Sequence, residues 1–192
     1  GSGTEKEKRG FSDRHYYHAV RGAITVSQIK GGGGTPVMGD PGLLADRWWG
    51  SRPKPVKRFR LGVVPHFVDQ HDPRIQEILR LKSTKLINVF SPVEEVIRDV
   101  QGCDFILSSS LHGLIIADAF SIPNQRMPLS SGIVSELKFD DYYSAFGLET
   151  PKPVYPEDIC QFGLNHPVFN SPCERPGLED IKDALTASFP AL

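Results

Sequence analysis

Several features common in other protein classes are missing from this sequence of 192 residues. No apolar run approaches the roughly 20 residues that a membrane-spanning helix needs. The longest run, residues 114–117, ends at Asp118. The first ten residues are polar and charged, so we expect no secretory signal peptide. These absences favour a cytoplasmic protein over a helical membrane protein.

Cysteines are few and show no pairing pattern. Cys103, Cys160 and Cys173 are odd in number, widely spaced, and form no Cys-x-x-Cys pair. Neither a zinc site nor a disulfide framework is therefore expected. Idle or buried thiols in a reducing compartment fit the pattern.

Neither positive nor negative charge is in excess. The net charge is −1 and the pI is about 6.7, so no basic excess attracts nucleic acid or anionic lipid. A small anionic ligand stays compatible with this balance, because a few local arginines suffice to bind it. The hydrophobic fraction of 39% is enough for one globular domain of this size.

Strand-like and helix-like segments alternate along the chain. The patterns predict strands at 15–19, 35–39, 59–67, 85–90, 105–108 and 125–129, and helices at 22–30, 72–79, 91–100, 112–120, 132–146 and 178–188. Short connections between them imply a Rossmann-like α/β fold, a parallel sheet with helices on both faces. We expect residues 1–14 to be a flexible lead-in, 15–192 to be one domain, glycines 31–34 to be a mobile loop, and the proline-rich tract 151–176 to wrap the surface.

Two of these helices carry a start signal. Asp72 is the expected N-cap of one helix, with Pro73 at its first position. Ser91 and Pro92 open another, with Glu94 at the capping-box position. Because both signals follow predicted strands, they support the strand–helix alternation.

The turn after the predicted strand 105–108 has the residues of an anion site. Ligands of open α/β sheets bind beyond the carboxyl ends of the strands. Here Ser109 and Ser110 precede Leu111, His112 and Gly113. The serines can cap the following helix, its first N–H groups attract anions, and glycine lets a ligand or a neighbouring element approach closely. A histidine that only hydrogen-bonds a carbonyl is the alternative, but the convergence of groups favours a site.

Two further turns hold candidate residues. Arg21 also follows a strand and opens a helix, where it could clamp a carboxylate or phosphate, or remain a solvated surface arginine. Asp40 lies in the turn 39–42, where it could cap the next helical turn or hold the base of the site.

Four motifs together resemble the polysaccharide pyruvyl transferase family. They are "RG-x-[IL]-T" at 21–25, "GDP-x-LL" at 39–44, "LHG" at 111–113 and "KF-x-DYY" at 138–143. The resemblance covers roughly residues 15–147. It implies transfer of pyruvate from phosphoenolpyruvate to a sugar of a cell-surface or exopolysaccharide precursor, forming a pyruvate ketal, with no metal or cofactor.

The resemblance also assigns roles to residues. It implies that His112 is the catalytic acid, and that the chain is the donor-binding half of a GT-B-like enzyme whose N-terminal partner domain is absent. That half alone is expected to be inactive. The family often has arginine at position 110, so the donor here would be held by Arg21, Arg126 and backbone amides. A lipid-linked oligosaccharide acceptor would bring the enzyme to the inner face of the membrane; the sequence leaves this and the oligomeric state open.

Two other functions fit the sequence. A GT-B-type nucleotide-sugar glycosyltransferase would share the fold, but it usually needs a carboxylate on the ribose, for which only Glu136 is a weak candidate. A non-catalytic carbohydrate-binding domain could stack a sugar on Trp48 and Trp49, which could equally close an inter-domain interface.

Overall fold

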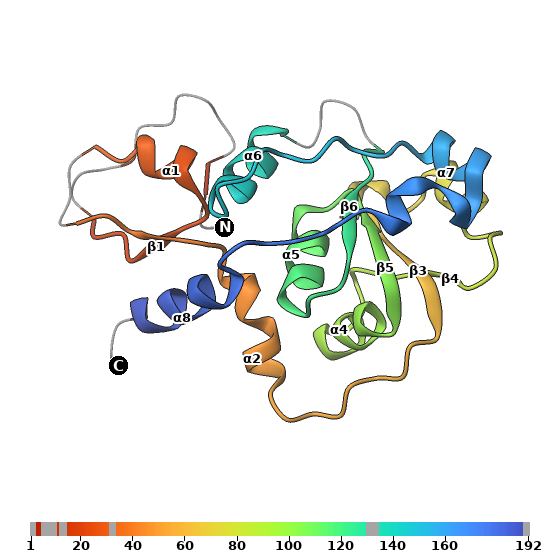
Figure 1. The fold of residues 1–192 in the computed structure, drawn as a ribbon, viewed down its shortest axis with the longest axis horizontal. Coiled ribbons are helices and arrows are strands. Elements are labelled where there is room, and N and C mark those ends of the chain that lie inside the picture. Colours follow the sequence, from red (N-terminus) through yellow and green to blue (C-terminus); the bar gives the residue numbers. More distant parts are fainter. Residues whose placement is uncertain (1–2, 5–10, 12–14, 31–33, 130–134, 190–192) are drawn as a thin grey trace. The chain divides into compact units, whose positions relative to one another are not determined.

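The computed structural model describes residues 3–4, 11, 15–30, 34–129 and 135–189 (Figure 1). The glycine tract 31–33 and the start of the helix expected at 132–146 lie outside the described residues. The chain divides into two compact units, each assembled from segments that are distant in sequence. Unit 1 comprises Gly1–Ala45, Val134–Thr150 and Arg175–Leu192, and unit 2 comprises Asp46–Ile133 and Pro151–Glu174. A single domain over 15–192 stays a prediction.

Unit 2 is built on a four-stranded sheet. The strand order is β4 (Thr84–Leu86), β3 (Phe59–Val64), β5 (Cys103–Ser108) and β6 (Asn124–Arg126), and every neighbouring pair is parallel. The crossovers are helices: α3 (Pro73–Ile78) joins β3 to β4, α4 (Val93–Gln101) joins β4 to β5, and α5 (Leu111–Ala119) joins β5 to β6. The predicted parallel α/β sheet is therefore confirmed.

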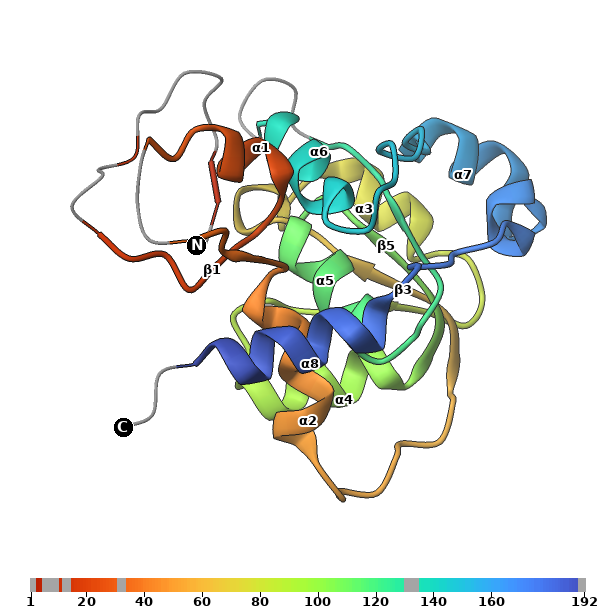
Figure 2. The ribbon, with the colours of Figure 1, turned by 60° about the vertical axis from the view of Figure 1, so that its left-hand side comes forward.

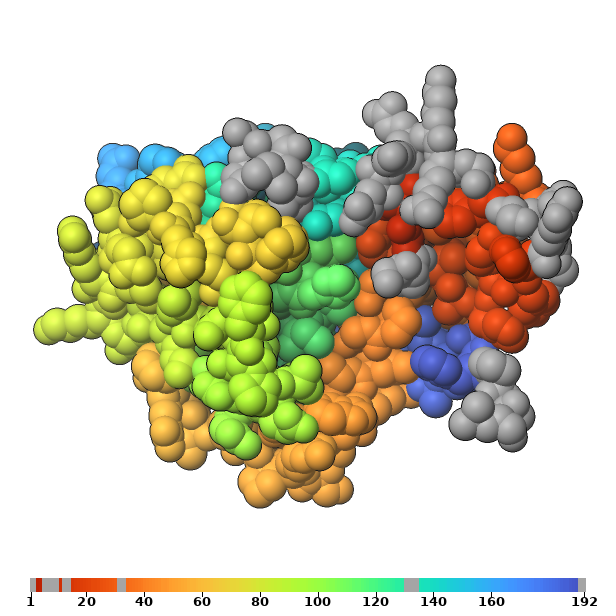
Figure 3. All heavy atoms as spheres, turned by 180° about the vertical axis from the view of Figure 1, so that it is seen from behind, coloured from red at the N-terminus to blue at the C-terminus, as the bar shows by residue number. Residues whose placement is uncertain are grey.

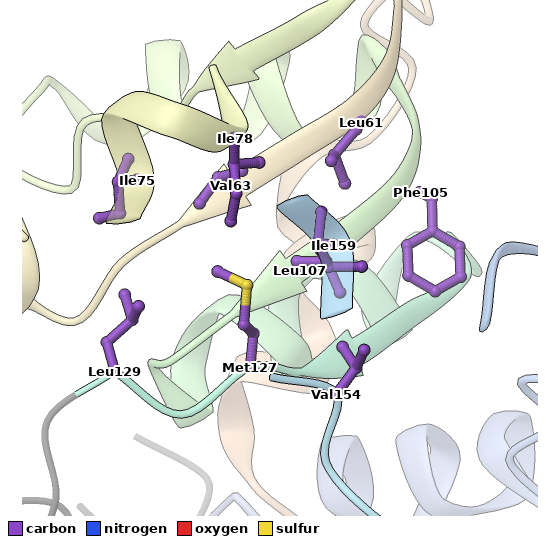
Figure 4. Close-up of a cluster of buried hydrophobic side chains, with 10 residues drawn as sticks. All are labelled: Leu61, Val63, Ile75, Ile78, Phe105, Leu107, Met127, Leu129, Val154 and Ile159. Carbon is purple, nitrogen blue, oxygen red and sulfur yellow. The ribbon is translucent and has the colours of Figure 1, made fainter. Parts of the chain in front are cut away.

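Helices cover both faces of this sheet (Figure 2). On one face, alternate residues of the central strands pack with α3, with α7 (Pro156–Phe162) and with the segment after β6 (Figure 4). The buried residues of this cluster are Leu61, Val63, Ile75, Ile78, Phe105, Leu107, Met127, Leu129, Val154 and Ile159. On the other face, Val64, Ile87 and Ile106 pack with α4 and α5. This double cover makes the central strands apolar on both sides.

The ends of the helices agree only partly with the sequence patterns. Asp72 caps α3 as predicted, since its carboxylate accepts from the N–H of Arg74 at 2.9 Å. The cap predicted for α4 is wrong: its N-cap is Pro92, with no side-chain hydrogen bond. The tract 151–176 contains α7 and two short 3-10 helices, Gly163–Asn165 and Pro167–Asn170.

Unit 1 contains a two-stranded parallel sheet of β1 (Ala19–Val20) and β2 (Val37–Met38). Around it lie α1 (Ala23–Ser27), η1 (Pro41–Leu44), α6 (Leu137–Ser144) and α8 (Leu178–Ser188), with α2 (Ala45–Trp49) following η1 in the chain. These strands and α1 are shorter than predicted. Thr4, which was expected to lie in a flexible lead-in, is buried and donates its N–H to Thr25 Oγ1 at 2.8 Å.

Within the described ranges, none of the helices has the length and apolar character that crossing a bilayer requires.

Candidate functional site

The turn between β5 and α5 is held by the hydroxyl of Ser108 at the carboxyl edge of the sheet. This buried hydroxyl donates to the carbonyl of Val64 at 2.7 Å, on the neighbouring strand β3. It also accepts from the N–H of Ser110 at 3.0 Å. The turn is thus tied both to itself and to β3, which gives a fixed starting direction to α5.

Gly113 packs the first turn of α5 against the same strand ends. A Cβ at this position would lie 2.3 Å from Ser108 Oγ and 2.8 Å from Val64 Cγ1. No side chain fits there, which confirms the predicted close approach of a neighbouring element. The glycine serves the packing of the helix onto the sheet.

His112 is exposed at the start of α5. Ser110 is the N-cap of this helix, but neither it nor another residue caps through its side chain. Among the described residues, none accepts a hydrogen bond from the N–H groups of Leu111, His112 or Gly113. These N–H groups carry the positive end of the helix dipole, so the turn presents donors beside an exposed imidazole.

Arg126 lies at the end of the neighbouring strand β6. It pairs with Ser108 in the sheet register and is buried. Its carbonyl accepts from the N–H of Val154 at 3.0 Å, which anchors the strand end. The structure therefore brings together Ser109, Ser110, Leu111, His112, Gly113 and Arg126 at one edge of unit 2.

A loop at this same edge was not predicted from the sequence. Ser109 Oγ donates to the buried carboxylate of Asp69 at 2.5 Å and accepts from the N–H of His66 at 2.8 Å. Both partners belong to the segment that follows β3. The turn was not expected because a strand was predicted over the whole of 59–67. In the structure β3 ends at Val64, and Pro65 directly after it is the sequence signal for the end of the strand.

Arg21 and Asp40 belong to unit 1 and make internal contacts there. Arg21 is buried, which overturns the surface alternative, and its Nε donates to the buried carboxylate of Asp141 at 3.1 Å. That carboxylate also accepts from the N–H of Thr25 at 2.8 Å and from its hydroxyl at 2.7 Å. Asp40 caps η1 by accepting from the N–H of Gly42 at 2.9 Å. Its capping role is therefore confirmed.

The remaining candidates differ in exposure. Glu136 is exposed in unit 1. Trp48 is half exposed and Trp49 is buried, and the guanidinium of Arg52 lies 5.0 Å from the centre of each ring. In the part of the chain that the structure describes, no group of three His, Cys, Asp or Glu side chains could hold a metal ion.

Comparison with known proteins finds two curated relatives. The chain is 27% identical over 158 residues to "Uncharacterized protein L143" of Acanthamoeba polyphaga mimivirus, covering 78% of this chain and 54% of that protein. It is 28% identical over 135 residues to "Succinoglycan biosynthesis protein ExoV" of Rhizobium meliloti (strain 1021), covering 68% of this chain and 40% of that protein. The chain spans about half the length of these relatives, and no solved structure matches it.

A family model, described as polysaccharide pyruvyl transferase, matches residues 2–124. The match includes the motifs at 21–25, 39–44 and 111–113, whereas the motif at 138–143 lies beyond it. Because the matched residues make up more than half of the chain and include the turn that carries His112, the chain belongs to the polysaccharide pyruvyl transferase family.

Proposed function

We propose that this chain is the donor-binding part of an enzyme that transfers pyruvate from phosphoenolpyruvate to a sugar and forms a pyruvate ketal. The observation that carries the proposal is the exposed His112 beside the first N–H groups of α5, for which the described residues provide no acceptor, at the carboxyl edge of the sheet. Membership of the family supports the reaction class. The binding edge expected of an open α/β sheet supports the location.

The donor is held in this proposal by groups at the ends of β5 and β6. The phosphate or carboxylate of phosphoenolpyruvate accepts from the N–H groups at the start of α5, which favour a negative charge. Arg126 supplies the cationic side chain in unit 2, since position 110 is a serine here. Arg21 as a further donor ligand stays a prediction from the sequence, because in unit 1 its Nε is paired with Asp141.

His112 acts as the general acid. It gives its proton to the methylene carbon of the enol phosphate, which becomes the methyl group of the product. The carbon that bears the phosphate then has oxocarbenium character and is attacked by a sugar hydroxyl. Loss of inorganic phosphate and attack by a second sugar hydroxyl then close the ketal. One of the two hydroxyl protons leaves with the phosphate, and the other returns to the imidazole of His112. The negative donor favours the charged imidazole in the complex.

The acceptor is proposed to be a sugar of a cell-surface or exopolysaccharide precursor. The name of the relative from Rhizobium meliloti assigns that protein to succinoglycan biosynthesis, which supports this class of acceptor. A lipid-linked oligosaccharide acceptor would bring the enzyme to the inner face of the membrane. Acceptor groups on a further, GT-B-like domain would explain why relatives are longer.

The proposal is tested by a His112→Ala exchange in a full-length enzyme that contains this chain. Loss of a general acid lowers turnover by about 10²–10⁴-fold. His18→Ala, another exposed histidine, is the matched control and keeps its activity. Near-normal turnover by the His112→Ala enzyme removes this residue from the mechanism.

Donor identity is tested by calorimetry on the chain itself. Saturable binding of phosphoenolpyruvate, weakened by His112→Ala, is the expected result. Binding of UDP or CMP without binding of phosphoenolpyruvate supports the nucleotide-sugar glycosyltransferase instead.

A further inference from the structure

Large apolar side chains are exposed in the two loops that follow β3 and β4. Phe67 is 61% exposed in the loop after β3, and Phe90 is 70% exposed in the loop after β4. Because β3 lies between β4 and β5 in a parallel sheet, these loops leave the same edge as the turn with His112. Figure 3 shows the segments after β3 (yellow) and β4 (yellow-green) beside the start of α5 (green).

The loop after β3 is held in place by hydrogen bonds. Asp69 accepts from Ser109 Oγ at 2.5 Å, and its N–H donates to the carbonyl of His66 at 2.8 Å. The side chain of Gln70 donates to the carbonyl of Pro65 at 3.1 Å. The loop therefore presents Phe67 on an ordered backbone. Because of this, little conformational entropy of the loop is lost when a ligand binds to the ring.

The ring of Phe67 is supported on one side by an imidazole. The ring centres of His66 and Phe67 are 4.4 Å apart, with the planes tilted by 39°. The imidazole is half-buried, whereas most of the phenyl ring is open to solvent. An ordered, backed and exposed aromatic ring is a surface on which a flat apolar group can stack.

We propose that Phe67 is a stacking platform for a pyranose ring of the saccharide acceptor. This inference rests on the proposed function, because the sugar must reach the donor at His112. A pyranose offers an apolar face of C–H groups to the ring, and the same loops carry polar side chains for its hydroxyls, among them His66, His71 and Asn88. Phe90 is a second exposed ring, in the loop after the neighbouring strand β4.

Charge and composition favour a sugar over other occupants of this surface. Residues 65–72 hold two carboxylates, Asp69 and Asp72, and no lysine or arginine. An anionic membrane surface attracts clusters of basic residues, which this loop lacks.

The inference is tested by NMR titration of the chain with the methyl glycosides of glucose, galactose and mannose. At least one of them is expected to bind saturably and to shift the ring signals of Phe67. Phe67→Ala weakens that binding by roughly five- to tenfold. Phe67→Trp retains it, because a larger aromatic face is kept.

Phe162→Ala is the matched control, since Phe162 is 50% exposed on α7. It leaves glycoside binding unchanged. The proposal is overturned if none of the three glycosides binds, or if Phe67→Ala binds them as the unchanged chain does.

A parallel titration with phosphoenolpyruvate separates the two proposals. Donor binding without glycoside binding overturns only the platform, and glycoside binding through Phe67 without donor binding supports the platform while contradicting the donor.

Discussion

Gly113 illustrates, at the scale of single residues, how closely α5 is packed onto the sheet. We expect Gly113→Ala to lower the free energy of unfolding by about 1–3 kcal/mol, because the new methyl group overpacks the site. The atoms that it would meet, Ser108 Oγ at 2.3 Å and Val64 Cγ1 at 2.8 Å, belong to strand ends that cannot easily move. Urea denaturation followed by circular dichroism measures the change.

Gly102→Ala provides the control for this prediction. Gly102 has φ −74, and an added Cβ would lie 3.4 Å from the carbonyl oxygens of Arg98 and Asp99, an ordinary contact. Gly102→Ala is therefore expected to change the free energy of unfolding by no more than about 0.5 kcal/mol. Equal effects of the two substitutions would contradict the packing of α5 described above.

The residues of the site differ in how far the sequence could reveal them. Ser109, His112 and Gly113 were found because they are contiguous and follow a recognisable strand. Asp69 was missed, since it meets Ser109 only through the pairing of β3 with β5, a contact across 40 positions of the chain. Arg21 follows a strand as predicted, but its burial depends on Asp141, which lies 120 positions away.

At the scale of elements, Asp141 joins α6 to α1. Its carboxylate is fully buried and pairs with Arg21 and with the N–H and hydroxyl of Thr25. Asp141→Ala leaves a buried guanidinium without its counter-charge, so the free energy of unfolding is expected to fall by about 3–5 kcal/mol. Asp140→Ala removes the exposed neighbour and is expected to cost less than about 1 kcal/mol. Comparable denaturation midpoints for both variants would contradict the bridging role.

The start of α3 predicts a dependence of stability on pH. Arg74 donates to the carboxylate of Asp72 and holds the pKa of that carboxyl below its usual range. A carboxyl with a lowered folded pKa stabilises the protein above its unfolded pKa of about 3.9, and this contribution is lost as the pH falls through the folded value. Asp72→Asn is therefore expected to be less stable at pH 7 by a few tenths to about 1 kcal/mol. This gap closes as the pH falls through the folded pKa of Asp72.

Asp72→Ala separates the charge from the cap. It loses the acceptor for the N–H of Arg74 as well, so it is expected to be less stable at pH 7 and at acid pH alike, by about 1 kcal/mol. Denaturation curves of the three proteins, recorded from pH 7 down through the range in which Asp72 becomes protonated, measure both effects. A stability gap between the unchanged chain and Asp72→Asn that persists at low pH would contradict the ion pair as its source.

The elements themselves were predicted best where apolar periodicity and flanking signals agreed. The strands of unit 2 and α8 have strong local patterns, and α3 begins at the predicted cap. The helix α7 was missed because prolines suggested an irregular tract, although Pro156 at its start, acidic residues in its first turn and Gly163 at its end are ordinary helix signals. The cap of α4 failed because nothing local forces Ser91 to turn its hydroxyl toward the helix.

At the scale of the whole molecule, the division into two units could not be read from the sequence. Unit 1 takes segments from the start, the middle and the end of the chain. Residues distant in sequence hold them together, such as Gly39 of unit 1, which packs against Ile181 and Leu185 of α8. Patterns of apolar residues report which face of an element is buried, but they do not name the partner that buries it.

The three cysteines all lie in unit 2 and allow its unfolding to be measured as a whole. Cys103 is fully buried at the start of β5, and burial raises the pKa of its thiol to about 12. The double variant Cys160→Ser, Cys173→Ser retains only Cys103. At pH 8 the folded variant is expected to react with a thiol reagent at least about 10³-fold more slowly than the same variant unfolded in urea, because the thiol becomes accessible only when the core opens. A chain that retains only the exposed Cys160 reacts while folded, slowed modestly because burial and Glu77 raise its pKa. Labelling of folded Cys103 as fast as in urea would mean that β5 opens without unfolding of unit 2.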